Sequence, residues 1–157
     1  MKSKIKSTKY LTRILAILRS RGKRIVFTNG CFDILHVGHV VYLSKAKRLG
    51  DILVIGLNSD SSIKKIKGKG RPINRESDRA KVLEALSSVD YIAIFGESTP
   101  EKIIMKLRPN VLVKGGDWKV EDIVGGDFVK KTGGKVKNIP FVKGYSTTSI
   151  IERSSCR

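Results

Sequence analysis

Five short segments of the chain are rich in apolar residues and end at glycine, proline or a polar residue typical of turns. They cover residues 24–30, 51–60, 91–95, 110–117 and 135–140. Most of them lack the alternation of polar and apolar positions that is typical of a strand with one solvent-exposed face. The pattern therefore predicts five strands, buried on both faces as in a parallel sheet.

Between these segments, apolar residues recur at helical spacing. Val40, Leu43, Ala46 and Leu49 follow one another every third residue, and Gly50 is placed to end that helix. A second helix over 76–89 is expected to turn Val82, Leu83, Leu86 and Val89 to one side. Further helices are predicted after Pro100, over 120–131, and over 146–155 with an N-cap at its start.

Two regions differ from this alternation. The basic segment 61–74 contains glycine and loses its apolar periodicity after Ile66, so it is predicted to be a loop. Residues 1–22 carry basic residues and no acid, and Leu11, Ile14, Leu15 and Leu18 form one apolar stripe. This extension is expected to be an amphipathic helix that packs on the domain or on a partner.

Strand and helix thus alternate about five times in a chain of 157 residues, a length that suits one domain. The predicted fold is α/β: a Rossmann-like, doubly wound parallel sheet of about five strands in a single domain. In such sheets, ligands bind beyond the carboxyl ends of the strands, where the strand order reverses. The segments that follow each strand are therefore the places to search for chemistry.

The charge balance restricts the partners. The chain has 32 Lys and Arg against 14 Asp and Glu, a formal net charge of +18, which favours polyanions and phosphorylated molecules. Two cysteines without a CxxC motif fit a reducing compartment, and no apolar stretch approaches the roughly 20 residues of a membrane span. A cytoplasmic location without membrane contact is expected.

Both histidines of the chain lie in the segment "TNGCFDILHVGH", Thr28 to His39, directly after the first predicted strand. His36 is expected at the mouth of the next helix and His39 in its first turn, with Gly38 leaving room for a ligand. Free N–H groups at a helix N-terminus attract anions, and two imidazoles there could donate hydrogen bonds to a phosphate. Two other interpretations remain open: a histidine that caps the helix, and a metal site formed with Asp33.

Other phosphate and hydrolase motifs do not match. The chain contains no GxxxxGK[ST] or GxGxxG motif and no serine in a GxSxG setting.

The segment "TNGCFDILHVGH" resembles the first signature, (T/S)xGxFDxxHxGH, of the nucleotidyltransferase family that includes the cytidylyltransferases. "KGYSTT", Lys143 to Thr148, resembles the second signature, and Arg79 in "ESDR" matches the arginine before the mid-chain helix. Over about residues 24–151 the chain is most similar to the branch that adenylylates heptose 1-phosphate. Its motifs "GLNSD", "GKGRPIN" and "LVKGGD" add to that likeness.

The resemblance implies a nucleotidyltransferase domain over 23–157 after the extension 1–22. It implies that AMP passes from ATP to a sugar 1-phosphate and that pyrophosphate leaves in line. The catalytic groups would be His36, His39 and Lys67, the last from the basic loop. Nucleotide-binding residues would be Thr28, Gly30, Cys31, Phe32, His36, Gly38, His39, Arg79, Gly115, Lys143, Gly144, Tyr145, Ser146, Thr147 and Thr148.

The acceptor sugar phosphate is expected to contact Asp33, Lys67, Lys114, Gly116 and Asp117. Asp33 has a second interpretation, in which it orients its loop, because a carboxylate amid phosphates is costly unless paired. Mg²⁺ is implied by the nucleotide triphosphate and not by any ligand cluster in the sequence. Relatives in the family are commonly homodimers, which makes the N-terminal helix a candidate contact.

Two alternatives to adenylyl transfer stay open. Cytidylyl transfer to glycerol 3-phosphate or another phosphorylated alcohol is one, although Phe141 stands where glycerol-phosphate cytidylyltransferases carry an arginine. The other is a non-catalytic nucleic-acid-binding module, suggested by the net charge. No aromatic residue interleaves the lysines of segment 61–74, as a platform for single strands would require, so a nucleic-acid partner is not expected.

Overall fold

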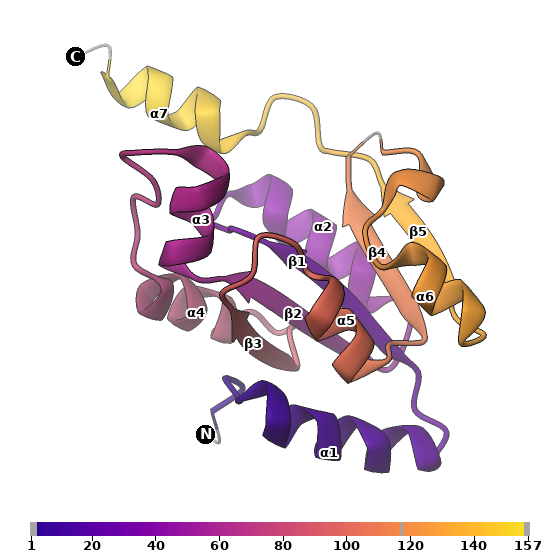
Figure 1. The fold of residues 1–157 in the computed structure, drawn as a ribbon. Helices are drawn as coiled ribbons and strands as arrows, with labels where there is room; N and C mark the ends of the chain where they lie inside the picture. Colours follow the sequence, from indigo (N-terminus) through magenta and orange to yellow (C-terminus); the bar gives the residue numbers. More distant parts are fainter. Residues whose placement is uncertain (1–2, 117, 156–157) are drawn as a thin grey trace.

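The computed structural model describes residues 3–116 and 118–155 and shows one sheet of five parallel strands between two layers of helices (Figure 1). The strand order is β3-β2-β1-β4-β5. In chain order the elements are α1 (Thr8–Ser20), β1 (Ile25–Gly30), α2 (Val37–Lys47), β2 (Ile52–Asn58), α3 (Asp60–Lys67), α4 (Glu76–Glu84), β3 (Tyr91–Phe95), α5 (Glu101–Leu107), β4 (Val111–Gly115), the 3₁₀ turn η1 (Val120–Asp122), α6 (Gly126–Lys131), β5 (Lys135–Ile139) and α7 (Thr147–Ser155). The predicted fold class is confirmed.

The apolar strands supply a core on each side of the sheet. One core joins α2 and α4 to the sheet through residues such as Leu43 and Leu83, both fully buried. The other joins α1, α5 and α6 to the opposite face, with Phe27 and Ile104 fully buried. Because both faces are covered, the strands need no polar side, which explains their continuous apolar runs.

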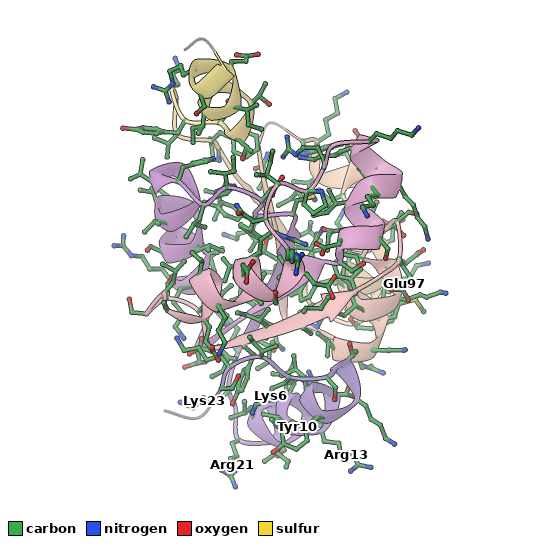
Figure 2. The ribbon with its side chains drawn as sticks, turned by 90° about the vertical axis from the view of Figure 1, so that its left-hand side faces the viewer. Lys6, Tyr10, Arg13, Arg21, Lys23 and Glu97 are labelled. Carbon is green, nitrogen blue, oxygen red and sulfur yellow. The ribbon has the colours of Figure 1, made fainter. Side chains whose placement is uncertain are left out.

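The N-terminal helix packs on the domain itself. Leu11 and Leu15 of the predicted stripe are fully buried in the second core, and Leu18 is partly buried against it. The residues before α1 continue the sheet edge, where the Lys6 amide donates to the Ile92 carbonyl at 2.9 Å. The opposite side of α1 faces away from the rest of the molecule, as Arg13 and Arg21 show in Figure 2.

Three predicted elements differ from the structure. Segment 61–74 is not a loop throughout, because α3 occupies residues 60–67; Ser59 caps it by accepting a hydrogen bond from the Ser62 amide at 3.1 Å. Only one apolar side chain of this helix, Ile63, is buried, which is why the periodicity was too weak to predict it.

The other two differences concern helix lengths. The helix predicted over 76–89 ends at Glu84, and Val82 lies on its exposed side while Leu83 is buried. The helix predicted over 120–131 is divided into η1 and α6, because Gly125 at their junction has φ of +82°, a left-handed conformation that interrupts a helix.

The strand order creates a crevice at the carboxyl ends of β1 and β4. From β1 the chain runs through α2 to β2 on one face, and after β3 it returns through α5 on the other face to place β4 beside β1. The two connections leave the strands in opposite directions, so the carboxyl ends of β1 and β4 are uncovered between them. None of the described helices is long and apolar enough to cross a membrane.

Candidate active site

A pocket of about 310 Å³ opens at this crevice. It is formed by the turn after β1, the first turn of α2, the end of α3, the end of β4 and the start of α7. In Figure 1 these segments lie on the upper side of the sheet. Its lining residues are Phe32, His36, Gly38, His39, Tyr42, Lys67, Gly115, Phe141, Val142, Tyr145, Ser146, Thr147 and Thr148. The structure thus brings together two sequence motifs that lie more than 100 residues apart.

The two imidazoles form a stacked pair in this pocket. Their ring centroids are 3.9 Å apart and their planes differ by 26°. His36 occupies the N-cap position of α2, yet its side chain makes no capping hydrogen bond, so the interpretation of a mere helix cap is wrong. The Nδ1 atoms of both rings are buried and have no hydrogen-bond partner within the described structure. Buried polar atoms without partners are costly, so the protein bears an energetic cost for holding the two rings in this stacked arrangement.

Gly38 makes this stacking possible. A Cβ atom at position 38 would lie 2.9 Å from Cε1 of His36 and 3.2 Å from Cβ of Tyr145. The glycine therefore leaves room for the first imidazole and for the loop before α7, and not only for a ligand.

The pocket disfavours charged imidazoles when it is empty. Burial, together with the smaller effects of the nearby His36 and Lys67, lowers the pKa of His39 to about 4. Burial also lowers the pKa of His36. Both rings are therefore neutral at pH 7 in the free protein, and a polyanion in the pocket would raise both pKa values.

The floor of the pocket is fixed by the turn after β1. Phe32 has φ of +45°, an uncommon conformation for a bulky residue, and its ring meets His39 edge-on with centroids 5.1 Å apart. Thr28 and Tyr42 share a buried hydrogen bond of 2.6 Å between their hydroxyls. The backbone of Thr28 is thereby held beneath the pocket, and its hydroxyl is already engaged.

Asp33 is buried and anchors the segment that follows α3. Its carboxylate accepts hydrogen bonds from Nε of Arg71 at 2.7 Å and from the amides of Ile73 and Asn74 at 2.9 Å. Burial alone would raise the pKa of Asp33, but these backbone and guanidinium donors lower it overall. These contacts favour the orienting interpretation of Asp33.

Arg79 ties the ends of several elements together below the pocket. It is 2% exposed, and it donates from Nη1 to the carbonyls of Cys31 at 2.6 Å and Asn58 at 2.9 Å. Its Nη2 pairs with Asp60 at 2.8 Å. With these partners Arg79 supports the backbone of the turn after β1 and is not among the residues that line the pocket.

The second motif lies across the pocket from the histidines. Ser146 accepts a hydrogen bond from the Ser149 amide at 3.0 Å, as an N-cap of α7 would, and Tyr145, Thr147 and Thr148 line the pocket beside it. Of the same motif, Lys143 and Gly144 are exposed and are not part of the lining. Hydroxyls at a helix N-terminus suit phosphate oxygens.

Successive residues at the end of β4 lie on opposite faces of the sheet. Gly115 lines the pocket, whereas Lys114 points to the other face of the sheet, into a second cavity. Gly116 has φ of +107°, and a Cβ there would lie 2.7 Å from the ring of Phe141, so this turn requires glycine. Gly30 and Cys31 continue the backbone from β1 into the turn, and Asp117 lies outside the described residues.

The sequence did not point to three lining residues. Tyr42 lies one helical turn after His39, a spacing that could have indicated it, and Val142 precedes the second motif without any pattern of its own. Phe141 was noted only as the residue in place of an arginine, and not as part of the pocket wall. Arg71 belongs to the basic segment 61–74, and nothing in the sequence pattern indicated that it is the partner of Asp33.

The described residues include no group of three His, Cys, Asp or Glu side chains that could hold a metal ion. The carboxylate of Asp33 is committed to Arg71 and to two backbone amides, so it does not join the histidines as a ligand. The described lining also contains no carboxylate, the group through which proteins bind Mg²⁺. The residues therefore do not fit a protein-held Mg²⁺ site.

Comparison with known proteins agrees with this geometry. The family model described as Cytidylyltransferase-like matches residues 27–153. The chain is 56% identical over 151 residues to "Bifunctional protein HldE" of Syntrophotalea carbinolica and 54% identical to that of Citrifermentans bemidjiense, covering 96% of this chain in each case. The chain spans 31% of the length of these curated relatives.

A solved structure shares the fold. The lipopolysaccharide core biosynthesis protein of Thermoplasma volcanium GSS1 superposes with a TM-score of 0.64 at 33% identity, covering 80% of this chain and 100% of that one. The pocket with its paired histidines, the family match over residues 27–153 and these relatives together show that the chain belongs to the cytidylyltransferase-like family of nucleotidyltransferases.

Proposed function

We propose that this protein transfers AMP from ATP to a sugar 1-phosphate, heptose 1-phosphate, and releases ADP-heptose and pyrophosphate. The observation that carries the proposal is the stacked pair His36 and His39, with unpartnered buried nitrogens, facing Lys67 and the start of α7 in one pocket. The choice of ATP and heptose rests on the relatives at 52–56% identity and on the motifs shared with the heptose-phosphate branch.

The reaction is a single displacement at phosphorus. An oxygen of the acceptor's phosphate forms a bond to the α-phosphorus of ATP, while the bond from that phosphorus to the bridging oxygen of the β-phosphate breaks and pyrophosphate leaves with the electron pair. Such a reaction requires alignment and charge neutralisation, and no covalent intermediate on the protein.

The described residues supply both requirements. His36 and His39 donate to the oxygens of the α-phosphate, where negative charge is redistributed in the transition state, and Lys67 adds a positive charge beside them. The hydroxyls and amides at the start of α7 hold the β- and γ-phosphates, so that the leaving group departs towards a helix N-terminus. No described residue of this chain is assigned to Mg²⁺.

The test is pyrophosphate release with ATP or CTP, in the presence of Mg²⁺, against heptose 1-phosphate and glycerol 3-phosphate. We expect turnover with ATP and heptose 1-phosphate, and a rate lowered roughly 100-fold or more in His39→Ala by analogy with the loss of one oxyanion donor. Turnover with CTP and glycerol 3-phosphate alone would replace the proposal with cytidylyl transfer. No turnover, with salt-sensitive RNA binding, would favour a nucleic-acid-binding module.

The proposal includes a cytoplasmic homodimer. The exposed side of α1 presents Tyr10 at 54% and Ile17 at 52% exposure between basic side chains, an apolar surface available to a second copy. Light scattering after gel filtration is expected to give twice the mass of 17.4 kDa. A monomeric mass at micromolar concentration would refute this part.

A further inference from the structure

The ring of His39 is not oriented through its Nδ1 atom. That atom is buried and has no hydrogen-bond partner among the described residues. In many enzymes a catalytic histidine is oriented by a hydrogen bond from its second ring nitrogen to a carboxylate or a carbonyl group. The ring of His39 instead contacts two other rings: His36 is stacked on it with centroids 3.9 Å apart, and Phe32 meets it edge-on at 5.1 Å.

Phe32 has a backbone conformation that a bulky residue rarely adopts. Its φ is +45°, and among the described residues Arg108 is the only other non-glycine residue with a positive φ. Arg108 ends helix α5, a place where the left-handed conformation is common. Phe32 ends no helix. A strained conformation of this kind persists at a functional site only where the surrounding structure holds it.

The residues on both sides of Phe32 are fixed by hydrogen bonds. The carbonyl of Cys31 accepts from Nη1 of Arg79 at 2.6 Å. The carbonyl of Asp33 accepts from Nδ2 of Asn74 at 2.6 Å, and its carboxylate accepts from the Asn74 amide at 2.9 Å. Arg79 also donates from Nε to the Asn74 carbonyl at 3.0 Å, which joins the two anchors. These contacts hold the backbone of Phe32 in its left-handed conformation.

The ring of Phe32 is seated against the end of β1. A Cβ atom at position 30 would lie 2.9 Å from Cε2 of Phe32, so the glycine there admits the ring. Phe32 is 7% exposed and belongs to the pocket wall. With its backbone held and its ring enclosed on the side of β1, Phe32 is a rigid support for the imidazole of His39.

We propose that Phe32 is a positioning residue for His39: its left-handed backbone, anchored through Cys31 and Asp33, directs the aromatic ring against the imidazole and aims that imidazole at the transferring phosphate. This inference rests on the proposed function, because it concerns the orientation of a histidine that acts in the transfer. It differs from the expectation that Phe32 binds the nucleotide, since Phe32 acts here through His39. Transfer at phosphorus depends on alignment, so a small rotation of the imidazole slows the chemical step and leaves substrate binding almost unchanged.

Phe32→Leu tests the ring contact, because it removes the ring and retains an apolar side chain. We expect kcat and the rate of a single turnover to fall roughly 10- to 100-fold, while the KM for ATP and for heptose 1-phosphate stays within about a factor of three. Phe95→Leu is the matched control, since Phe95 is 5% exposed, has no positive φ and does not line the pocket. Its kcat should stay within about a factor of two of wild type.

NMR of protein with labelled histidine measures the ring contact independently of activity. The chain has two histidines, so two sets of ring signals are expected, and His36→Gln assigns them. In Phe32→Leu the ring-proton shifts of His39 are expected to change more than those of His36. In Phe95→Leu neither set should move. Circular dichroism and urea unfolding show whether each variant is folded.

A double-mutant cycle tests the anchor at Asp33. If Asp33 acts through Phe32, Asp33→Asn lowers kcat in the same direction as Phe32→Leu, and the double variant shows little further loss. Losses that multiply would show that Asp33 acts by another route, and they would overturn the anchoring.

The outcomes separate this inference from the proposed function. Turnover by the wild type with an unchanged kcat in Phe32→Leu would overturn the positioning role and leave the function intact, and a rise in the KM for ATP alone would assign Phe32 to the nucleotide. Equal losses in Phe32→Leu and Phe95→Leu would also overturn it, since they would reflect a general loss of packing. Without pyrophosphate release by the wild type, adenylyl transfer is refuted and the His39 signals decide: a shift in Phe32→Leu supports the ring contact, and unmoved signals overturn it.

Discussion

Protonation of His39 is expected to accompany ATP binding. Burial, the adjacent His36 and Lys67 hold the pKa of His39 at about 4 in the free protein, so the ring is neutral at pH 5.5 and above. A triphosphate brings negative charge into the same pocket and favours the imidazolium. The pKa of His39 therefore rises on binding, and the complex takes up a proton that the free protein does not hold.

The size of the effect follows from the two pKa values. At pH 5.5 a group with a pKa of about 4 is roughly 3% protonated. If ATP restores the pKa to the ordinary value of about 6.5, binding takes up about 0.9 proton; if it restores the pKa halfway, binding takes up about 0.3 proton. The sign is fixed: because the complex holds the proton more tightly, the contribution of His39 to ATP affinity grows as the pH falls from 7.5 to 5.

The assay is isothermal titration of ATP into the protein, without acceptor, at pH 5.5 in two buffers of different ionisation enthalpy. The difference in observed heat gives the number of protons taken up. His39→Gln keeps a hydrogen-bond donor but does not titrate, and protonation of ATP itself contributes equally to both proteins. An equal proton count for wild type and His39→Gln, with both proteins folded by circular dichroism, would refute the assignment of this histidine to the phosphates.

Three further substitutions test two residues that stabilise the fold, Asp33 and Gly56, and one residue of the pocket, Lys67. Asp33→Asn is expected to lower the free energy of unfolding by roughly 3 kcal/mol, because it leaves Arg71 half-buried without its counter-charge. Gly56→Ala is expected to cost about 1–3 kcal/mol, because the added Cβ would lie 2.6 Å from Cζ of the fully buried Phe27. Both are measured by urea unfolding. Lys67→Met is expected to lower kcat roughly 10- to 100-fold without loss of stability, since its side chain lines the pocket while the residue is exposed.

Each of these expectations has a matched comparison. Lys65 lies on the same helix as Lys67 but does not line the pocket, so Lys65→Met should retain the wild-type kcat. An equal loss of kcat in both lysine variants would show that the positive charge of the helix matters and that Lys67 makes no specific contact. Val82→Ala, at an exposed position, should unfold at nearly the wild-type urea concentration. Wild-type stability of Asp33→Asn would show that the pair with Arg71 contributes little.

The sequence determined the strands and the location of the pocket that contains the two histidines. Continuous apolar segments such as Ile25–Gly30 form strands that both helical layers cover, and this pattern is local, so it can be recognised without the fold. The histidine motif placed two imidazoles at the start of α2 for the same reason, because a strand, a tight turn and a helix follow one another within 20 residues. Helix α3 escaped prediction because its stability comes from a cap and one buried side chain.

Only the tertiary structure decided which distant residues meet. The alternation of strands and helices does not specify that β4 lies beside β1, and that neighbour relation brings Asn29 and Lys114 into one cavity and the two motifs into one pocket. Likewise Asp33 meets Arg71 across 38 residues of chain. Such contacts depend on strand order and on the turns between elements, which are set by the packing of the whole sheet and leave no periodic trace in the sequence.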